Sequence, residues 1–143
     1  MATAAQAEDR VVNLYSWADY VAPQTLQRFE QETGIKVRYD TFDSTEVMET
    51  KLLTGGSGYD VVVPSSSVLA RGLAAGALLA IPHDSLKGYA NLDPDLLEKL
   101  AAVDPGNRYG VPYTWGTLGL GMNVEAVQQR LPGVPLNSLD ILF

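Results

Sequence analysis

Short apolar runs recur along the first half of the chain, and a stretch with helical spacing follows each of them. The runs occupy residues 11–15, 35–39 and 59–63. Near-continuous apolar runs of this length are typical of strands that helices cover on both faces of a sheet. The stretch after the first run begins at Pro23, which suits a first helical position, and stops at Gly34, which suits a left-handed helix end.

The other two helical stretches carry capping signals of their own. Asp43 and Glu46 have the spacing of a capping box ahead of the second stretch. Ser66 or Ser67 is placed to cap the third stretch. The predicted order of elements is therefore β-α-β-α-β-α.

This order implies an α/β fold with a mostly parallel, doubly wound sheet, helices on both faces and right-handed crossovers. The commonest small arrangement places the first strand between the second and the third. Ligands of such sheets bind beyond the carboxyl ends of the strands, where the strand order reverses. Because residues 17–20 and 64–67 follow the first and third strands, we expect both loops to line one site.

The second half of the chain has a different pattern. Asp93 followed by Pro94 is a strong helix start. Residues 109–123 read as an apolar strand in which Gly119 and Gly121 indicate a bend or a close backbone approach. This segment is interpreted as a hinge strand, and residues 124–131 are expected to form one more short helix.

These patterns predict four parts of the chain. The first ten residues contain Ala5-Gln6-Ala7, a small-x-small pattern that is typical of a signal cleavage region or of a disordered tail. The predicted parts are a tail or signal remnant at 1–10, a first α/β lobe at 11–108, a hinge or crossing strand at 109–123, and the start of an incomplete second lobe at 124–143.

Composition narrows the class of partner. The chain has 143 residues, is 46% hydrophobic and carries a net charge of −7. An acidic surface disfavours nucleic acid and anionic membranes, and no stretch approaches the ~20 apolar residues that span a bilayer. Cysteine is absent, which excludes disulfides and thiolate metal sites. We therefore expect no metal, no cofactor, no nucleic acid and no membrane insertion.

The loop after the first strand has the chemistry of a site for an organic cation. Trp17 and Tyr20 offer aromatic faces to an ammonium group, and Asp19 offers the counter-charge. Each feature also has a structural interpretation, because aromatic pairs commonly pack at a core and Ser65 and Ser67 commonly cap a helix. An enzymatic interpretation is weak, since the serines have no neighbouring base in the sequence.

Five stretches of the chain resemble the periplasmic polyamine-binding proteins of ABC transporters, the receptors for putrescine and spermidine. They are residues 14–23, which contain Trp17-Ala18-Asp19-Tyr20, and residues 29–37, 43–47, 58–65 and 111–117. The resemblance covers only the N-terminal part of that family. It implies a type II periplasmic binding fold of two lobes, truncated here before the second lobe is complete, with the polyamine held in the cleft between them.

By this resemblance, Trp17 and Tyr20 belong to an aromatic box, Asp19 faces an ammonium group, and Ser65 and Ser67 line the cleft floor. The sequence departs from the family at Ala18, where a hydroxyl residue is usual. The resemblance implies a periplasmic, non-enzymatic carrier that delivers its ligand to an ABC permease. Two alternatives stay open: a receptor for an anionic or neutral solute on the same fold, and a non-transporting fragment that self-associates through apolar residues near 118–122 and 139–143.

Overall fold

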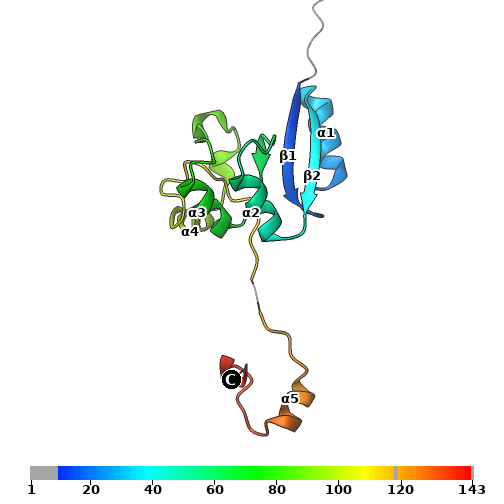
Figure 1. The fold of residues 1–143 in the computed structure, drawn as a ribbon, viewed down its shortest axis with the longest axis vertical. Helices are drawn as coiled ribbons and strands as arrows, with labels where there is room; N and C mark the ends of the chain where they lie inside the picture. Colours follow the sequence, from blue (N-terminus) through cyan, green and yellow to red (C-terminus); the bar gives the residue numbers. More distant parts are fainter. Residues whose placement is uncertain (1–9, 118, 143) are drawn as a thin grey trace, which may run out of the picture. The chain divides into compact units, whose positions relative to one another are not determined.

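The computed structural model of the protein describes residues 10–117 and 119–142 and contains one three-stranded parallel sheet (Figure 1). Its strands are β1 (Val11–Trp17), β2 (Lys36–Phe42) and β3 (Val61–Val62). Their order is β2-β1-β3, so the predicted central place of the first strand is confirmed. The third strand is shorter than its apolar run, because only Leu14 and Tyr15 of β1 pair with it.

Five α-helices and three short 3-10 helices are found in the described residues. The α-helices are α1 (Pro23–Thr33), α2 (Thr45–Leu53), α3 (Ser66–Ala74), α4 (Pro94–Ala101) and α5 (Val124–Arg130). The 3-10 helices are η1 (His83–Ser85), η2 (Tyr89–Asn91) and η3 (Leu139–Leu142). As the sequence predicted, α1 starts at Pro23 and ends at Gly34 with φ 68°, and Asp93 caps α4 by accepting from the amides of Asp95 and Leu96.

Two predicted caps are wrong. Ser44, and not Asp43, precedes the first residue of α2, and its hydroxyl accepts a hydrogen bond from the Val47 amide. The extended backbone of Ser44 places its side chain over the open amides of the first turn, which is the geometry that a cap requires. The residue preceding α3 is Ser65, whereas Ser66 and Ser67 already lie inside the helix.

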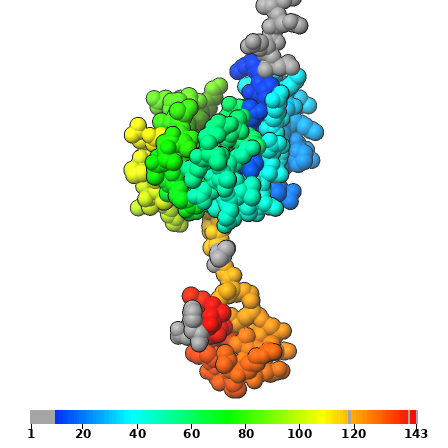
Figure 2. Space-filling view, in the orientation of Figure 1, coloured from blue at the N-terminus to red at the C-terminus, as the bar shows by residue number. Residues whose placement is uncertain are grey.

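Helices cover both faces of the sheet. The core on one face joins side chains from β1, β2, α2 and α3, namely Tyr15, Phe42, Met48, Leu52 and Val68. In Figure 1, α1 lies on the opposite side of β1 and β2 from α2. The side chains of α2 fill the surface between α3 and β2 in the space-filling view (Figure 2). The doubly wound arrangement predicted from the sequence is confirmed.

The chain divides into two compact units, with the boundary between Tyr113 and Thr114. The expected strand within residues 109–123 is not formed in the part of this segment that the structure describes. A strand needs a neighbouring strand to satisfy its amides and carbonyls, and this segment pairs with none of the described strands. The division into lobes and hinge stays a prediction, and the predicted tail lies, except for Arg10, outside the described residues.

The second unit contains α5 and η3. Asn123 caps α5, because its side-chain oxygen accepts a hydrogen bond of 3.0 Å from the Ala126 amide. Of the apolar residues expected to drive self-association, Leu120, Leu139 and Leu142 are more than half exposed. Leu118 and Phe143 lie outside the described residues. Across the described chain, no helix combines the length and the apolar character needed to cross a bilayer.

Candidate functional site

The two loops singled out from the sequence leave the sheet at neighbouring points. The Val63 amide donates to the Tyr15 carbonyl at 2.9 Å, just beyond the paired residues of β1 and β3. Trp17 ends β1 two residues after Tyr15, and Ser65 follows Val63 by two residues. Both loops therefore begin at the carboxyl edge of the sheet, between the two strands where the strand order reverses.

Trp17 is partly buried at this edge of the sheet. Its ring centroid lies 4.6 Å from that of Phe42, with the planes tilted by 56°, and 6.2 Å from that of Tyr20. Phe42 belongs to the buried core, and Trp17 packs against that core. Trp17 therefore has a structural role, because its side chain packs against the core. Part of the same side chain stays exposed to solvent.

Asp19 lies at the tip of the turn that follows β1. Its φ of 61° is one of two positive values among the described residues other than glycine, and aspartate tolerates this left-handed region better than most residues. The side chain is exposed, and Tyr20 beside it is 47% exposed. The turn therefore carries one exposed carboxylate and two aromatic side chains within four residues.

Two tyrosine hydroxyls hold the ends of this turn, and sequence reasoning missed both. Tyr39, from β2, donates to the Trp17 carbonyl at 3.1 Å. Tyr113 donates to the Tyr20 carbonyl at 2.5 Å, across 93 positions of sequence. The sequence contained one signal, because Tyr113 lies in a stretch that carries the family resemblance, but its partner could be identified only in three dimensions.

Ser65 and Ser67 form a pair at the start of α3. Their hydroxyl oxygens lie 3.1 Å apart, and Ser65 makes no side-chain cap to the helix amides. Ser65 is half-buried and Ser67 is exposed. Within the described chain, no hydrogen bond joins either serine to Trp17, Asp19 or Tyr20, so the structure brings the two loops to one edge without a direct bond between them.

Asp104 is a second feature that the sequence analysis missed. Its side chain is 1% exposed, and its carboxylate accepts the backbone amides of Arg108, Tyr109 and Gly110 at 3.1, 2.9 and 2.8 Å. Three amide donors satisfy a buried carboxylate without a cation. This cradle fixes the backbone three residues before Tyr113.

The perturbed titratable groups lie away from the two loops. The hydrogen bond from Arg71 holds the pKa of Glu49 below its ordinary value, and the same contact raises the pKa of Arg71. Burial, followed by the hydrogen bond to Asp40, raises the pKa of Tyr59. The Glu49–Arg71 pair joins α2 to α3, and the Tyr59 hydroxyl joins the segment before β3 to Asp40 of β2. Among the described residues, no cluster of three or more histidine, cysteine or carboxylate side chains is arranged to hold a metal ion.

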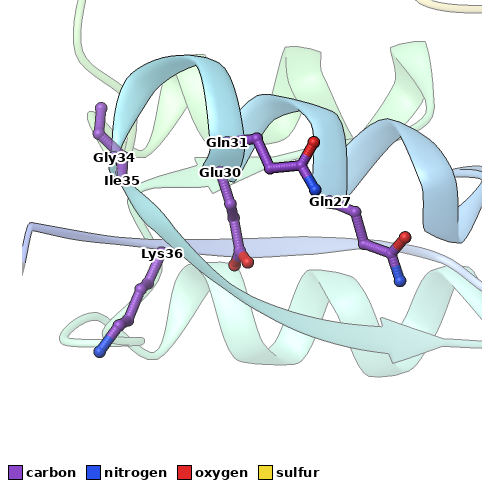
Figure 3. A pocket seen from close by; sticks show the side chains of 6 residues that line it. All are labelled: Gln27, Glu30, Gln31, Gly34, Ile35 and Lys36. Atoms are coloured by element: carbon purple, nitrogen blue, oxygen red, sulfur yellow. The ribbon is translucent and has the colours of Figure 1, made fainter.

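Two surface hollows of the described residues also lie away from the two loops. One is lined by residues of α1 and the start of β2: Gln27, Glu30, Gln31, Gly34, Ile35 and Lys36 (Figure 3). In this hollow the Glu30 carboxylate already accepts the Val37 amide at 2.7 Å, which ties α1 to β2. This hydrogen bond gives the residues of the hollow a structural role.

The chain belongs to the family of bacterial extracellular solute-binding proteins, whose profile matches residues 24–143. It is 47% identical over 138 residues to the putrescine-binding periplasmic protein SpuD of Pseudomonas aeruginosa, covering 96% of this chain and 38% of that protein. It is 42% identical over 130 residues to the spermidine/putrescine-binding periplasmic protein of Escherichia coli, covering 90% of this chain and 37% of the relative.

Solved structures give the same fold. The spermidine/putrescine substrate-binding protein PotD of Streptococcus pneumoniae superposes with a TM-score of 0.71 at 37% identity, over 76% of this chain and 33% of that one. The TpPotD lipoprotein of Treponema pallidum gives a TM-score of 0.69 at 33% identity, over 73% and 32%. The predicted α/β lobe of a type II periplasmic binding fold is confirmed, and the chain spans less than two-fifths of these relatives.

Proposed function

We propose that this chain is part of the solute-binding component of a polyamine ABC transporter and carries one side of a site for putrescine or spermidine. The observation that carries the proposal is the exposed Asp19 side chain in the same turn as the Trp17 and Tyr20 rings, whose centroids lie 6.2 Å apart, at the carboxyl edge of the sheet. The relatives named above are binding proteins for these polyamines. The periplasmic location expected from the sequence agrees with their names.

Each residue has a defined task in this proposal. Asp19 pairs with an ammonium group, because a desolvated ammonium without a counter-charge costs several kcal/mol. Trp17 and Tyr20 cover the methylenes and contribute about 0.5–2 kcal/mol each through cation–π contact. Ser65 and Ser67 line the floor and accept hydrogen bonds from the ligand. The ligand leaves unchanged, so the protein is a carrier for permease subunits and not an enzyme.

One observation favours a different ligand. The paired hydroxyls of Ser65 and Ser67 lie at the N-terminus of α3, a nine-residue helix, and the amides of helix N-termini attract anions. A receptor for an anionic solute on the same fold is therefore the second candidate. Asp19 opposes it, because a carboxylate beside a bound anion is repulsive.

Calorimetry on a chimaera separates these functions. Residues 11–143 replace the matching segment of the Pseudomonas putrescine-binding relative, so that the cleft is complete, and a cooperative unfolding transition verifies the fold. Heat of binding with putrescine or spermidine, and none with sulfate, is the expected result. Heat with sulfate alone would favour the anion receptor, and no heat with any of the three would leave this chain without a binding role.

A further inference from the structure

The carbonyls at both ends of the Trp17–Tyr20 turn accept hydroxyl donors from distant parts of the chain. Tyr39 donates to the Trp17 carbonyl and Tyr113 donates to the Tyr20 carbonyl. We propose that Tyr39 and Tyr113 are positioning residues that clamp this turn in the conformation that binds the ligand. The inference rests on the proposed function, because it holds that the conformation of the turn determines the affinity for polyamine.

The turn needs support from outside because its own bonds are weak. Asp19 sits at φ 61°, a region that costs energy for residues other than glycine. The closing bond within the turn, from the Tyr20 amide to the Trp17 carbonyl, is long at 3.5 Å. The Ala18 amide is held by the Phe42 carbonyl at 3.1 Å. The Trp17 and Tyr20 carbonyls are therefore held in place mainly by the hydroxyls of Tyr39 and Tyr113.

The two clamps have different anchors. Tyr39 lies in β2 and is in register with Leu14 of β1, so the parallel ladder fixes its position. Tyr113 follows the Asp104 cradle, where Gly110 packs so closely that an added Cβ would lie 3.1 Å from Leu69. Tyr113 itself is 58% exposed and is the final residue of the first unit. Tyr39 is thus a fixed clamp, and Tyr113 is a clamp that can open.

An open clamp lowers affinity without unfolding the lobe. If only the clamped turn binds polyamine, the apparent dissociation constant equals the intrinsic one divided by the fraction of clamped molecules, so it rises as that fraction falls. One hydrogen bond is typically enough to change such an equilibrium about three- to tenfold. The Tyr113 bond therefore couples the ligand loop to the point where the chain leaves the first unit.

The first test uses the 143-residue chain. The Trp115→Phe background leaves Trp17 as the sole tryptophan, since the chain has two, and its fluorescence then reports on the turn. In this background Tyr113→Phe and Tyr39→Phe should each raise acrylamide quenching of Trp17 and accelerate amide exchange at residues 18–20 several-fold. The matched control is Tyr109→Phe, which removes a hydroxyl with no hydrogen-bond partner among the described residues. Thermal midpoints within about 2 °C of each other would show that the lobe stays folded.

The second test measures putrescine affinity in the chimaera described above. Tyr113→Phe should weaken binding about three- to tenfold, whereas Tyr109→Phe should leave it unchanged. Equal quenching, exchange and affinity in Tyr113→Phe and Tyr109→Phe would overturn the clamp. A chimaera that fails to bind putrescine before any tyrosine is changed would instead overturn the proposed function, while quenching and exchange in the 143-residue chain would still decide whether the clamp exists.

Discussion

The Val63 amide and the Tyr15 carbonyl, 2.9 Å apart, join β3 to the central strand just before both strands run into the candidate site. This bond sets the Trp17–Tyr20 turn beside the start of α3. The two loops are far apart in sequence, and only the parallel pairing of β1 with β3 brings them to one edge. The polyamine proposal depends on that arrangement.

The first prediction concerns the counter-charge. In the chimaera, Asp19→Asn should weaken putrescine binding by roughly 2–5 kcal/mol, because a bound ammonium then lacks its carboxylate. Asparagine also tolerates the positive φ at this position, so the turn should keep its shape. Calorimetry measures the effect, and an affinity within threefold of the unmodified chimaera would remove Asp19 from this role.

The second prediction concerns Trp17. Replacement by alanine should cost on the order of 2 kcal/mol in polyamine binding, through lost contact area and cation–π attraction. It should also lower the free energy of unfolding, because the ring packs against Phe42. Measuring binding and denaturant unfolding on the same variant separates the two effects. Lost stability with unchanged affinity would mean that Trp17 serves packing alone.

The third prediction tests the core that supports the site. Met48 is 1% exposed and packs in the cluster with Tyr15 and Phe42. Met48→Ala should lower the free energy of unfolding by about 2–5 kcal/mol, because it leaves a cavity beside β1. Val47→Ala, one residue earlier and 52% exposed, should change it by less than about 0.5 kcal/mol. Similar values for the two variants would contradict the assignment of the buried face of α2.

The fourth prediction concerns pH. Arg71 donates two hydrogen bonds to the Glu49 carboxylate and lowers its pKa. A lowered folded-state pKa contributes stability above the unfolded-state value, and this contribution is lost as the pH falls through the folded-state value. The loss of stability caused by Glu49→Gln should therefore be present at neutral pH and disappear as the pH falls through the lowered folded-state pKa of Glu49.

Urea unfolding at several pH values measures this trend. Glu98→Gln is a control for the change of charge alone, because Glu98 lies on the exposed side of α4. A Glu49→Gln effect that is constant from neutral to acid pH would mean that the ion pair between α2 and α3 does not stabilise the folded state.

Local signals predicted most of the fold. The apolar runs located the strands, and Pro23, Gly34 and Asp93 marked helix ends because their backbone preferences act within one turn. The caps of α2 and α3 were misplaced by one or two residues because neighbouring serines and acids carry similar signals. The strand expected within residues 109–123 is not formed in the described part of that segment, since a strand depends on a partner that local pattern does not supply.

The candidate site was predictable only in outline. Ligands of such sheets bind where the strand order reverses, and this expectation placed Trp17, Asp19 and Ser65 at one edge of the sheet. It could not show that Tyr113 reaches the Tyr20 carbonyl, or that Asp104 collects three amides, because both arrangements depend on backbone geometry far from the loop. Hydroxyl donors and buried carboxylates of this kind have no periodic signature in sequence.

The most direct test of the account is a magnetic resonance titration of the isotope-labelled 143-residue chain with putrescine. One side of a cleft leaves the ammonium largely solvated, where an ion pair is worth only about 1 kcal/mol, so the dissociation constant should be no tighter than about 1 mM. The predicted result is a set of shift changes centred on Trp17, Asp19, Tyr20, Ser65 and Ser67 that Asp19→Asn abolishes. Changes confined to other acidic surfaces, such as that of α2, would contradict the placement of a polyamine site at the carboxyl edge of the sheet.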